Sequence, residues 1–254
     1  MKMNMFTLEN TYAIVTGGAR GIGKKGAEAL IAAGSNVIIA DIDIDIAQKT
    51  AEEIKTKNSL VFAIKTDVTN PKSVHEMVNQ TLRYFGKIDI LFNNAGICIN
   101  EPAETMTFES WKRVIDINLT GVFVVAQEVG KVMIKQKKGS IINTASMSGH
   151  IVNIPQPQCA YNASKAGVIQ LTKSLAIEWA PYNVRVNSIS PGYIATEMTN
   201  KAPAEWKYDW IQMSPYKRLG NPEELQLALL YLASNGSSFT TGSDLLIDGG
   251  FTCV

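Results

Sequence analysis

Seven short apolar runs that alternate with longer amphipathic stretches place the strongest constraint on the fold of this chain. Each run is rich in β-branched residues and is short enough for a strand, whereas the stretches between the early runs show helical spacing. Strands that are apolar throughout and separated by helices are typical of a parallel sheet covered on both faces. Because crossovers are right-handed, we predict a doubly wound α/β sheet of about seven strands with helices on both faces. The expected strands span residues 12–16, 36–40, 59–65, 88–93, 139–145, 184–190 and 243–249.

One domain accounts for the whole sequence. The chain has 254 residues, of which 46% are hydrophobic, so it can bury a sizeable core. Internal repeats, low-complexity tracts and Pro/Gly-rich linkers are not visible, and helical signals continue to residue 234 with a further strand close behind. We therefore expect a single domain over residues 1–254.

Charge and cysteine usage exclude several classes of partner. The chain carries 24 basic and 23 acidic residues without a long run of either sign, which argues against nucleic acid or an anionic membrane as the main partner. A signal peptide is not visible before the first strand, and no segment approaches the roughly 20 apolar residues of a membrane helix. Cys98, Cys159 and Cys253 form an odd set without metal-ligand spacing. These features favour a cytoplasmic protein.

A glycine-rich turn follows the first strand directly. The sequence Gly17-Gly18-Ala19-Arg20-Gly21-Ile22-Gly23 then leads into a helical stretch. Glycines permit a tight turn and a close approach of the backbone to a pyrophosphate, while the helix N-terminus supplies free N–H donors and partial positive charge. In this position the turn indicates a dinucleotide-binding, Rossmann-like domain.

The second strand ends at Asp41, 24 residues after Gly17. A carboxylate there can hydrogen-bond the ribose hydroxyls of adenosine and repels a 2′-phosphate, which favours NAD and makes NADP the less favoured cofactor. Asp43 and Asp45 follow closely and could share or replace this role. Arg20 is a cation that could meet a 2′-phosphate. Asp41 could alternatively serve only as the N-cap of the next helix.

Tyr161 and Lys165 lie four residues apart in a stretch that reads as helix. This spacing places a phenol and an ammonium group on one helix face. A phenol has an ordinary pKa of about 10, and a cation beside it favours the phenolate and lowers that pKa toward the working range. The pair therefore indicates an acid/base site, although it could equally be a surface lysine beside a half-buried tyrosine.

Four ordered motifs resemble those of the classical short-chain dehydrogenase/reductase family, and the resemblance covers essentially the whole chain. They are the turn at 16–23, Asn-Asn-Ala-Gly at 93–96, Tyr-x-x-x-Lys at 161–165, and Pro-Gly at 191–192 followed by Thr196. The resemblance implies a single dinucleotide-binding and catalytic domain with Asn118, Ser146, Tyr161 and Lys165 as catalytic residues. It also implies cofactor contacts from Gly17, Arg20, Gly21, Ile22, Gly23, Asp41, Asp67, Val68, Asn94, Ala95, Gly96, Tyr161, Lys165, Pro191, Gly192, Ile194 and Thr196.

Two serines compete for the catalytic position that the resemblance implies. Family members usually place this serine 13 residues before the tyrosine, a count that lands on Ser148. Alignment on the preceding strand instead selects Ser146, which lies 15 residues before Tyr161. The difference is explained if Pro-Gln-Pro-Gln at 155–158 lengthens the loop by two residues. We prefer Ser146 and keep Ser148 as the alternative.

The implied reaction is hydride transfer between a nicotinamide and a carbinol or carbonyl carbon. Tyr161 would take the alcohol proton in oxidation and return it in reduction, while Lys165 would stabilise the phenolate and bind the nicotinamide ribose. Ser146 would hydrogen-bond the substrate oxygen. Asn118 would help to hold a proton-relay water, unless it is an ordinary helix-interior amide.

The stretch 146–167 resembles polyol and ketose members of the family, such as sorbose reductases, mannitol dehydrogenases and arabinitol dehydrogenases. Ser148, Asn153, Gln156 and Gln158 supply polar groups suited to a sugar alcohol or ketose, although the amides could instead satisfy loop backbone. Residues 195–217 would form a lid over the substrate. Its aromatic residues would seal the lid or pack on a neighbouring subunit; they are Trp206, Tyr208 and Trp210.

Other functions remain open at this point. A 3-oxoacyl-[acyl-carrier-protein] reductase shares the catalytic motifs, but it would prefer NADPH, which Asp41 opposes. A nucleotide-sensing module without turnover would not need the intact catalytic set, and a steroid or aromatic-alcohol dehydrogenase would want a more apolar pocket. The resemblance suggests a homotetramer joined through helices at 107–136 and 158–180 and through the C-terminal segment. We expect no metal site, because His75 and His150 lack ligand partners at useful spacing.

Overall fold

The computed structural model describes residues 6–254 and contains one seven-stranded parallel sheet. The strand order is β3-β2-β1-β4-β5-β6-β7, which confirms the predicted doubly wound architecture. Every strand begins and ends within two residues of its predicted bounds. The strands are β1 (Tyr12–Thr16), β2 (Asn36–Asp41), β3 (Val61–Lys65), β4 (Ile90–Asn93), β5 (Gly139–Thr144), β6 (Val184–Pro191) and β7 (Asp244–Ile247).

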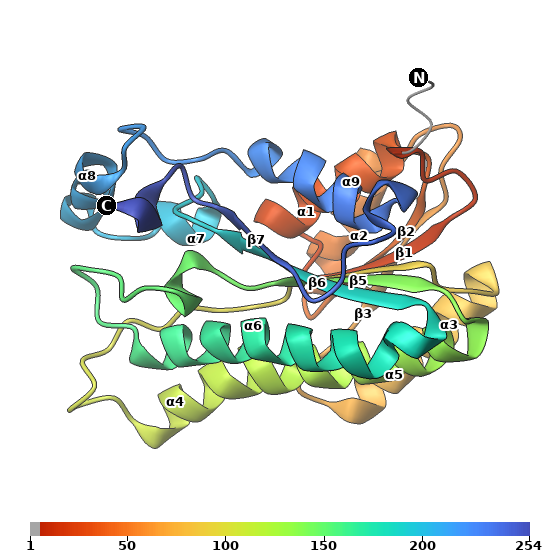
Figure 1. Ribbon diagram of the computed structural model, residues 1–254, viewed down its shortest axis with the longest axis horizontal. Coiled ribbons are helices and arrows are strands. Elements are labelled where there is room, and N and C mark those ends of the chain that lie inside the picture. Colours follow the sequence, from red (N-terminus) through yellow and green to blue (C-terminus); the bar gives the residue numbers. More distant parts are fainter. Residues whose placement is uncertain (1–5) are drawn as a thin grey trace.

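The strand order reverses beside β1, which pairs with β2 on one side and with β4 on the other. Because all seven strands are parallel, their carboxyl ends meet at one edge of the sheet, where ligands bind in open α/β folds. The loops after β1, β4, β5 and β6 leave from this edge. Figure 1 shows the same end of the molecule flanked by α8 and the C-terminus.

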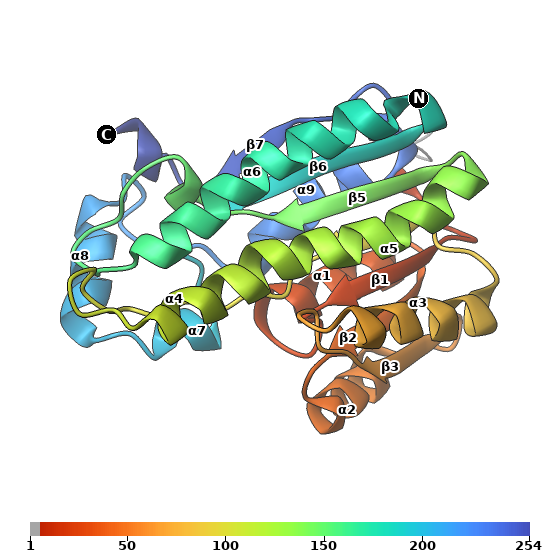
Figure 2. The same cartoon turned by 90° about the horizontal axis from the view of Figure 1, so that it is seen from below.

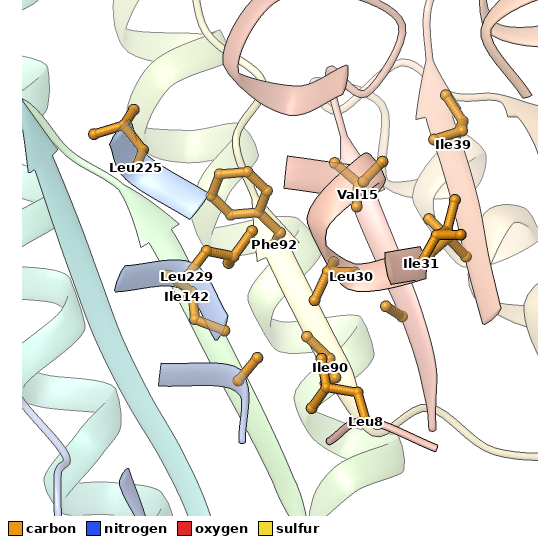
Figure 3. Packing of buried hydrophobic residues seen from close by; sticks show 14 of the residues in the cluster. Leu8, Val15, Leu30, Ile31, Ile39, Ile90, Phe92, Ile142, Leu225 and Leu229 are labelled. Carbon is orange, nitrogen blue, oxygen red and sulfur yellow. The ribbon is translucent and has the colours of Figure 1, made fainter. Parts of the chain in front are cut away.

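Three helices cover one face of the sheet, drawn above it in Figure 1. They are α1 (Gly21–Ala32), α2 (Ile44–Ile54) and α9 (Gln226–Ala233). Figure 3 shows how this face packs: Leu30 and Leu229 from two helices meet Phe92 of β4, and all three side chains are buried. The strands contribute Val15, Ile39, Ile90 and Ile142 to the same cluster, as their apolar character predicts.

The opposite face is covered by longer helices, which lie in front of the sheet in Figure 2 and run alongside its strands. They are α3 (Pro71–Phe85), α5 (Gly121–Gln136) and α6 (Cys159–Trp179). Helix α4 (Phe108–Ile115) joins α5 through a π-helical turn, Asp116–Thr120. Two short helices lie in the loop after β6, namely α7 (Glu197–Asn200) and α8 (Ala204–Met213).

The continuous helical run Phe108–Gln136 is long and apolar enough, by length and composition, to cross a membrane. The expectation that no segment approaches this limit is therefore wrong. In the structure the run packs on the sheet, with Val125, Val129 and Met133 completely buried in the core. Core packing thus accounts for its apolar composition.

A ladder of buried polar hydrogen bonds, formed by side chains, links the helices and strands that carry the site. Asn93 of β4 donates to the Val122 carbonyl of α5 at 2.8 Å and to Asn143 of β5 at 3.2 Å. Asn143 in turn donates to Thr172 of α6 at 2.9 Å. Buried and satisfied networks of this kind fix a unique packing. The ladder therefore holds α6 in register with the carboxyl ends of β4 and β5.

Candidate active site

The glycine turn after β1 is too tightly packed for larger residues. A Cβ added to Gly23 would lie 2.1 Å from the Gly17 carbonyl oxygen, and one added to Gly17 would lie 2.9 Å from the Ala95 Cα. Gly17 and Gly21 also have φ values of +60° and +52°, which favour glycine. The predicted glycines thus form a cradle in which backbone atoms pack too closely for a side chain at Gly17 or Gly23.

Helix α1 begins in this turn without a side-chain cap. By contrast, the first turns of α2, α3 and α4 are capped by Asp43, Asn70 and Thr107. Uncapped N–H groups at a helix start, together with the helix dipole, attract an anion. The chemistry of this turn therefore fits the pyrophosphate of a dinucleotide.

The Asn-Asn-Ala-Gly motif clamps the glycine turn to β4. Thr16 Oγ1 accepts from the backbone N–H groups of Asn94 at 2.9 Å and Ala95 at 3.1 Å. The Asn94 amide donates to the Thr16 carbonyl at 3.2 Å and accepts from Thr144 Oγ1 at 3.2 Å. β1, β4 and β5 are thus linked at their carboxyl ends.

Asp41 faces the glycine turn and not the following helix. One carboxylate oxygen accepts from the Ala19 N–H at 3.1 Å and the other from the Asp43 N–H at 3.1 Å. The alternative that Asp41 caps α2 is wrong, because Asp43 accepts from Ile46 N at that helix start. Arg20 pairs with Asp43 at 2.7 Å, and both side chains are partly exposed. The acidic and basic candidates for cofactor selection therefore lie together beside the turn.

The remaining cofactor candidates lie at the carboxyl ends of β3 and β6. Asp67 and Val68 follow β3, where the Asp67 carboxylate accepts from Thr69 N at 2.9 Å and Val68 is buried. Ile194 is buried after β6 and forms an isolated bridge with Gly220. The structure therefore brings the cofactor candidates to one edge of the sheet. Asp45 lies in the first turn of α2 and is exposed to solvent.

Tyr161 and Lys165 lie one turn apart on α6, as their spacing predicts. The alternative of a surface lysine is wrong, because Lys165 is only 3% exposed. Its Nζ donates to the Thr144 carbonyl at 2.7 Å and lies 5.6 Å from the centroid of the Tyr161 ring. A Cβ added to Gly96 would lie 3.6 Å from the same Nζ, so the backbone of the β4 loop passes close to the ammonium.

The pKa values of this pair differ from the sequence expectation. The pKa of Tyr161 is raised and not lowered, mainly because burial penalises the phenolate; neighbouring Cys98 and Tyr193 add to the rise, and a hydrogen bond with Ser146 opposes it. Burial also lowers the pKa of Lys165 to about 8. The ammonium lies over the ring and donates to Thr144, so desolvation outweighs its attraction for the phenolate.

Asn118 lies in the π-helical turn and is completely buried. Its amide accepts from Ile97 N at 2.9 Å and donates to the Ile97 carbonyl at 2.8 Å and to Ser164 Oγ at 3.2 Å. Ser164 donates to the Tyr161 carbonyl at 2.7 Å. Asn118 is therefore not an ordinary helix-interior amide, because it joins the loop after β4 to the turn of α6 that carries Tyr161.

The two candidate serines hydrogen-bond each other at the end of β5. Ser146 Oγ donates to Ser148 Oγ at 3.1 Å and accepts from Ser148 N at 3.1 Å. Ser146 also lies close enough to the Tyr161 phenol to oppose the rise of its pKa. Ser148 instead accepts from the Gln158 amide at 3.2 Å. The geometry thus joins Ser146 to the phenol and Ser148 to the loop.

The three predicted substrate amides are buried and bonded within the protein. Asn153, Gln156 and Gln158 are 3%, 4% and 7% exposed. Their partners include Tyr193 and, from the expected lid, Trp210. Trp210 is buried, whereas Tyr208 is 64% exposed and Trp206 is partly exposed.

Three residues at the site were not singled out from the sequence. Thr144 receives the Lys165 ammonium, Cys98 follows the Asn-Asn-Ala-Gly motif, and Tyr193 follows Pro191-Gly192. Burial raises the pKa of the Cys98 thiol to about 11, so the thiol is protonated at neutral pH. Only the position of Tyr193 directly after a motif residue gave a signal that sequence reasoning could have used.

Comparisons with known proteins agree with this geometry. A family model described as enoyl-(acyl carrier protein) reductase matches residues 17–252. The chain is 44% identical over 254 residues to a sorbose reductase of Candida albicans, covering 99% of this chain and 90% of that protein. It is 41% identical over 255 residues to an NADP-dependent mannitol dehydrogenase of Alternaria alternata, covering 99% of this chain and 95% of that protein.

Among solved structures, a short-chain type dehydrogenase/reductase from Mycobacterium marinum superposes with a TM-score of 0.97 at 45% identity, covering 99% of both chains. The predicted resemblance to polyol and ketose members is thereby confirmed. The glycine turn, the buried tyrosine–lysine pair and these relatives together lead to one assignment. The chain belongs to the classical short-chain dehydrogenase/reductase family and is an NAD(P)-dependent oxidoreductase acting on CH–OH groups.

Proposed function

We propose that this enzyme transfers a hydride between NAD(H) and the carbinol or carbonyl carbon of a sugar alcohol or ketose. The observation that carries the proposal is the buried Lys165 ammonium beside the Tyr161 ring, at the same sheet edge as the glycine turn. The substrate class is supported by relatives whose names specify sorbose and mannitol.

Tyr161 acts as the acid/base group in this proposal. When bound, the nicotinamide gives or takes the hydride. In reduction Tyr161 donates its proton to the substrate oxygen, and its raised pKa keeps the phenol protonated at neutral pH. In oxidation the same group must first lose its proton, so alcohol oxidation is favoured by alkaline conditions. Ser146 turns its hydroxyl proton from Ser148 to the reacting oxygen as charge develops there.

Lys165 and Asn118 organise the acid/base group. With a pKa of about 8, Lys165 keeps its charge at neutral pH and can hold the hydroxyls of the nicotinamide ribose. Asn118 fixes the loop at Ile97 and, through Ser164, the helical turn of Tyr161. We also propose that Asn118 helps to hold the proton-relay water that the family resemblance implies.

We propose that NAD is preferred over NADP. Asp41 presents a carboxylate beside the glycine turn, where it meets the ribose hydroxyls and repels a 2′-phosphate. Arg20, the cation that could bind this phosphate, is engaged by Asp43 at 2.7 Å. The mannitol dehydrogenase relative is named as NADP-dependent, so kcat/KM must be compared for NAD and NADP in this enzyme.

We further propose a cytoplasmic homotetramer with residues 195–217 as the substrate lid. Large apolar side chains on α4, α5 and α6 support self-association, because Phe108 is 73%, Phe123 39% and Ile177 76% exposed. The lid is supported by Trp210, which reaches from α8 to the loop that carries Gln156. Light scattering of the purified protein would give a mass four times that of the chain.

A substrate screen with both reduced and oxidised cofactors tests the proposal. Polyols are offered with NAD or NADP, and ketoses and an acetoacetyl thioester with NADH or NADPH, while cofactor absorbance is followed. We expect turnover of at least one polyol–ketose pair, with higher kcat/KM for the NAD form. Reduction of the thioester without activity on any polyol or ketose would refute the substrate class and favour an acyl-carrier-protein reductase.

A further inference from the structure

The hydroxyl of Tyr193 lies in a chain of buried hydrogen bonds that connects α8 with the end of β5. From α8, Trp210 Nε1 donates to Gln156 Oε1 at 2.9 Å. Gln156 Nε2 donates to Tyr193 Oη at 2.8 Å, and Asn153 Nδ2 donates to the same oxygen at 3.1 Å. We call the set Ser146, Ser148, Asn153, Gln156, Gln158, Tyr193 and Trp210 the hydroxyl–amide chain.

The direction of the two Gln156 hydrogen bonds is fixed by chemistry. An indole N–H can only donate, so Gln156 must turn its oxygen to Trp210 and its NH₂ group to Tyr193. The oxygen of Asn153 is occupied by the Gln158 amide at 3.2 Å, which turns the Asn153 NH₂ group to Tyr193 as well. Both acceptor positions of the Tyr193 oxygen are therefore filled.

One proton remains on the Tyr193 hydroxyl. Within residues 6–254 it has no hydrogen-bond acceptor, although both amides beside it are buried. The ring itself is held firmly, stacked on Trp210 with centroids 4.2 Å apart and in edge contact with Phe251 at 5.3 Å. A rigidly placed donor without a partner in a partly buried setting is typical of a group that meets a ligand.

The hydroxyl shares its surroundings with the acid/base group. Tyr193 follows Pro191 and Gly192 at the carboxyl end of β6, next to the strand that leads to Ser146. The thiol of Cys98 lies 3.9 Å from Gln158 Oε1. Because Gln158 belongs to the hydroxyl–amide chain, the loop after β4 that carries Cys98 also borders this chain.

We propose that Tyr193 is a specificity-determining residue that donates a hydrogen bond to a second substrate oxygen, on a carbon next to the reacting carbon. Gln156 and Asn153 are positioning residues, because they donate to the Tyr193 oxygen and leave its proton free for a ligand. This inference rests on the proposed function and narrows it to substrates with vicinal oxygens. An analogue without the second oxygen leaves the donor unpaired, a penalty that hydrogen-bonding sites use for rejection.

The same chain also places the group proposed to hold the reacting oxygen. From Asn153 it continues through the Gln158 amide to Ser148 Oγ at 3.2 Å, and from there to Ser146 Oγ at 3.1 Å. Ser146 and Tyr193 are thus set relative to each other by one buried network. Their separation is therefore fixed before substrate binds.

The first test is Tyr193→Phe, which keeps the ring and its stacking. The variant and the wild type are assayed with NADH on L-sorbose and D-fructose, on hydroxyacetone, and on acetone, which lacks the second oxygen. We expect kcat/KM for hydroxyacetone and the accepted ketose to fall about 10- to 100-fold, while that for acetone stays within about twofold. Equal losses on hydroxyacetone and acetone would overturn the inference.

The second test, Gln156→Glu, keeps the Tyr193 hydroxyl but diverts its proton. A carboxylate accepts from both Trp210 and Tyr193, so the Tyr193 proton no longer points to substrate. We expect the same selective loss on hydroxyacetone, with partial recovery at acidic pH as the new carboxyl group is protonated. Wild-type selectivity in this variant, at every pH, would overturn the inference.

The wild-type enzyme separates this inference from the function on which it rests. If the wild type reduces no ketose and oxidises no polyol, both the proposed function and the inference are refuted. If it reduces ketoses but accepts acetone as well as hydroxyacetone, only the inference is refuted. Thermal unfolding and NADH binding of both variants are measured alongside, and we expect NADH affinity within about twofold of wild type.

Discussion

The cofactor side and the substrate side of the sheet edge are built from different materials. On the cofactor side, around β1 and β2, the proposed binding surface is formed mostly by backbone: the glycine turn, the uncapped start of α1 and the Ala19 N–H that donates to Asp41. On the substrate side, after β5 and β6, the proposed binding surface is formed by the side chains of the hydroxyl–amide chain. Backbone recognition suits a cofactor of constant shape, whereas side-chain recognition can be changed residue by residue.

The largest expected effect is a loss of turnover without a loss of cofactor affinity, which distinguishes the substrate side from the cofactor side. Tyr161→Phe removes the acid/base proton without changing the glycine turn, so we expect turnover to fall about 10²- to 10⁴-fold. NADH affinity, measured by fluorescence titration, should remain within about twofold of wild type. Near-normal turnover would refute the role of the phenol.

Substitution of each of the two serines on the substrate side tests which of them takes part in catalysis. Ser146 interacts with Tyr161, so Ser146→Ala should lower kcat about 10²- to 10³-fold, as loss of an oxyanion donor does. Ser148→Ala removes a link to Gln158 and should lower kcat by only about tenfold. The reverse order would assign the catalytic role to Ser148.

The cofactor side was the more predictable from sequence, for a physical reason. Positive φ and close backbone approach require glycine itself, so Gly17 and Gly21 leave a local signature. The strands were predictable because buried parallel strands are apolar throughout. Contacts such as Trp210 with Gln156, 54 residues apart, have no local signature, because they depend on how separate loops pack.

The same limit explains one question that the sequence left open at the site and one error. Asp41 and Asp43 both precede α2, and only the fold shows that Asp43 caps the helix while Asp41 turns to Ala19. Spacing placed Lys165 next to Tyr161 correctly, but it could not reveal that burial of both groups would decide the pKa of the phenol. Desolvation depends on the whole surroundings and not on one neighbour.

Gly23→Ala tests whether the cofactor side depends on backbone packing. The new methyl would lie 2.1 Å from the Gly17 carbonyl oxygen, so the turn must shift. Overpacking of this kind costs about 1–3 kcal/mol, and we expect NADH affinity to fall about tenfold. Gly236→Ala is the control, because its Cβ would meet nothing closer than 3.3 Å. Unchanged NADH affinity in Gly23→Ala would show that cofactor binding does not depend on the tight backbone packing of the glycine turn.

Asp41→Ala tests the carboxylate that we propose selects NAD on the cofactor side. Loss of the carboxylate removes a hydrogen bond to the ribose and the repulsion of a 2′-phosphate, so the NADPH/NADH ratio of kcat/KM should rise about fivefold. Asp43→Ala is the matched variant, because it releases Arg20 while leaving Asp41 in place. If neither substitution changes the ratio, cofactor choice does not reside at this position.

The smallest expected effect lies where the two sides meet, at Lys165. Its pKa is lowered from 10.5 to about 8, so the free enzyme loses the ammonium charge above pH 8. Since the charged form is the one proposed to hold the nicotinamide ribose, NADH affinity should fall about threefold between neutral and mildly alkaline pH. In Lys165→Met the affinity should be lower throughout and should not change over this window.

Unfolding cannot account for the fall in NADH affinity, because the contribution of Lys165 to folding stability changes with pH in the opposite direction. Between pH 8 and 10.5 the unfolded chain holds the Lys165 proton that the folded protein has lost. The unfolded state therefore binds more protons, so the contribution of this group to folding stability rises with pH across the window. Affinity that falls while the melting temperature holds would locate the effect at the ammonium. Affinity that stays constant to pH 10 would show that the ribose does not depend on the charge of Lys165.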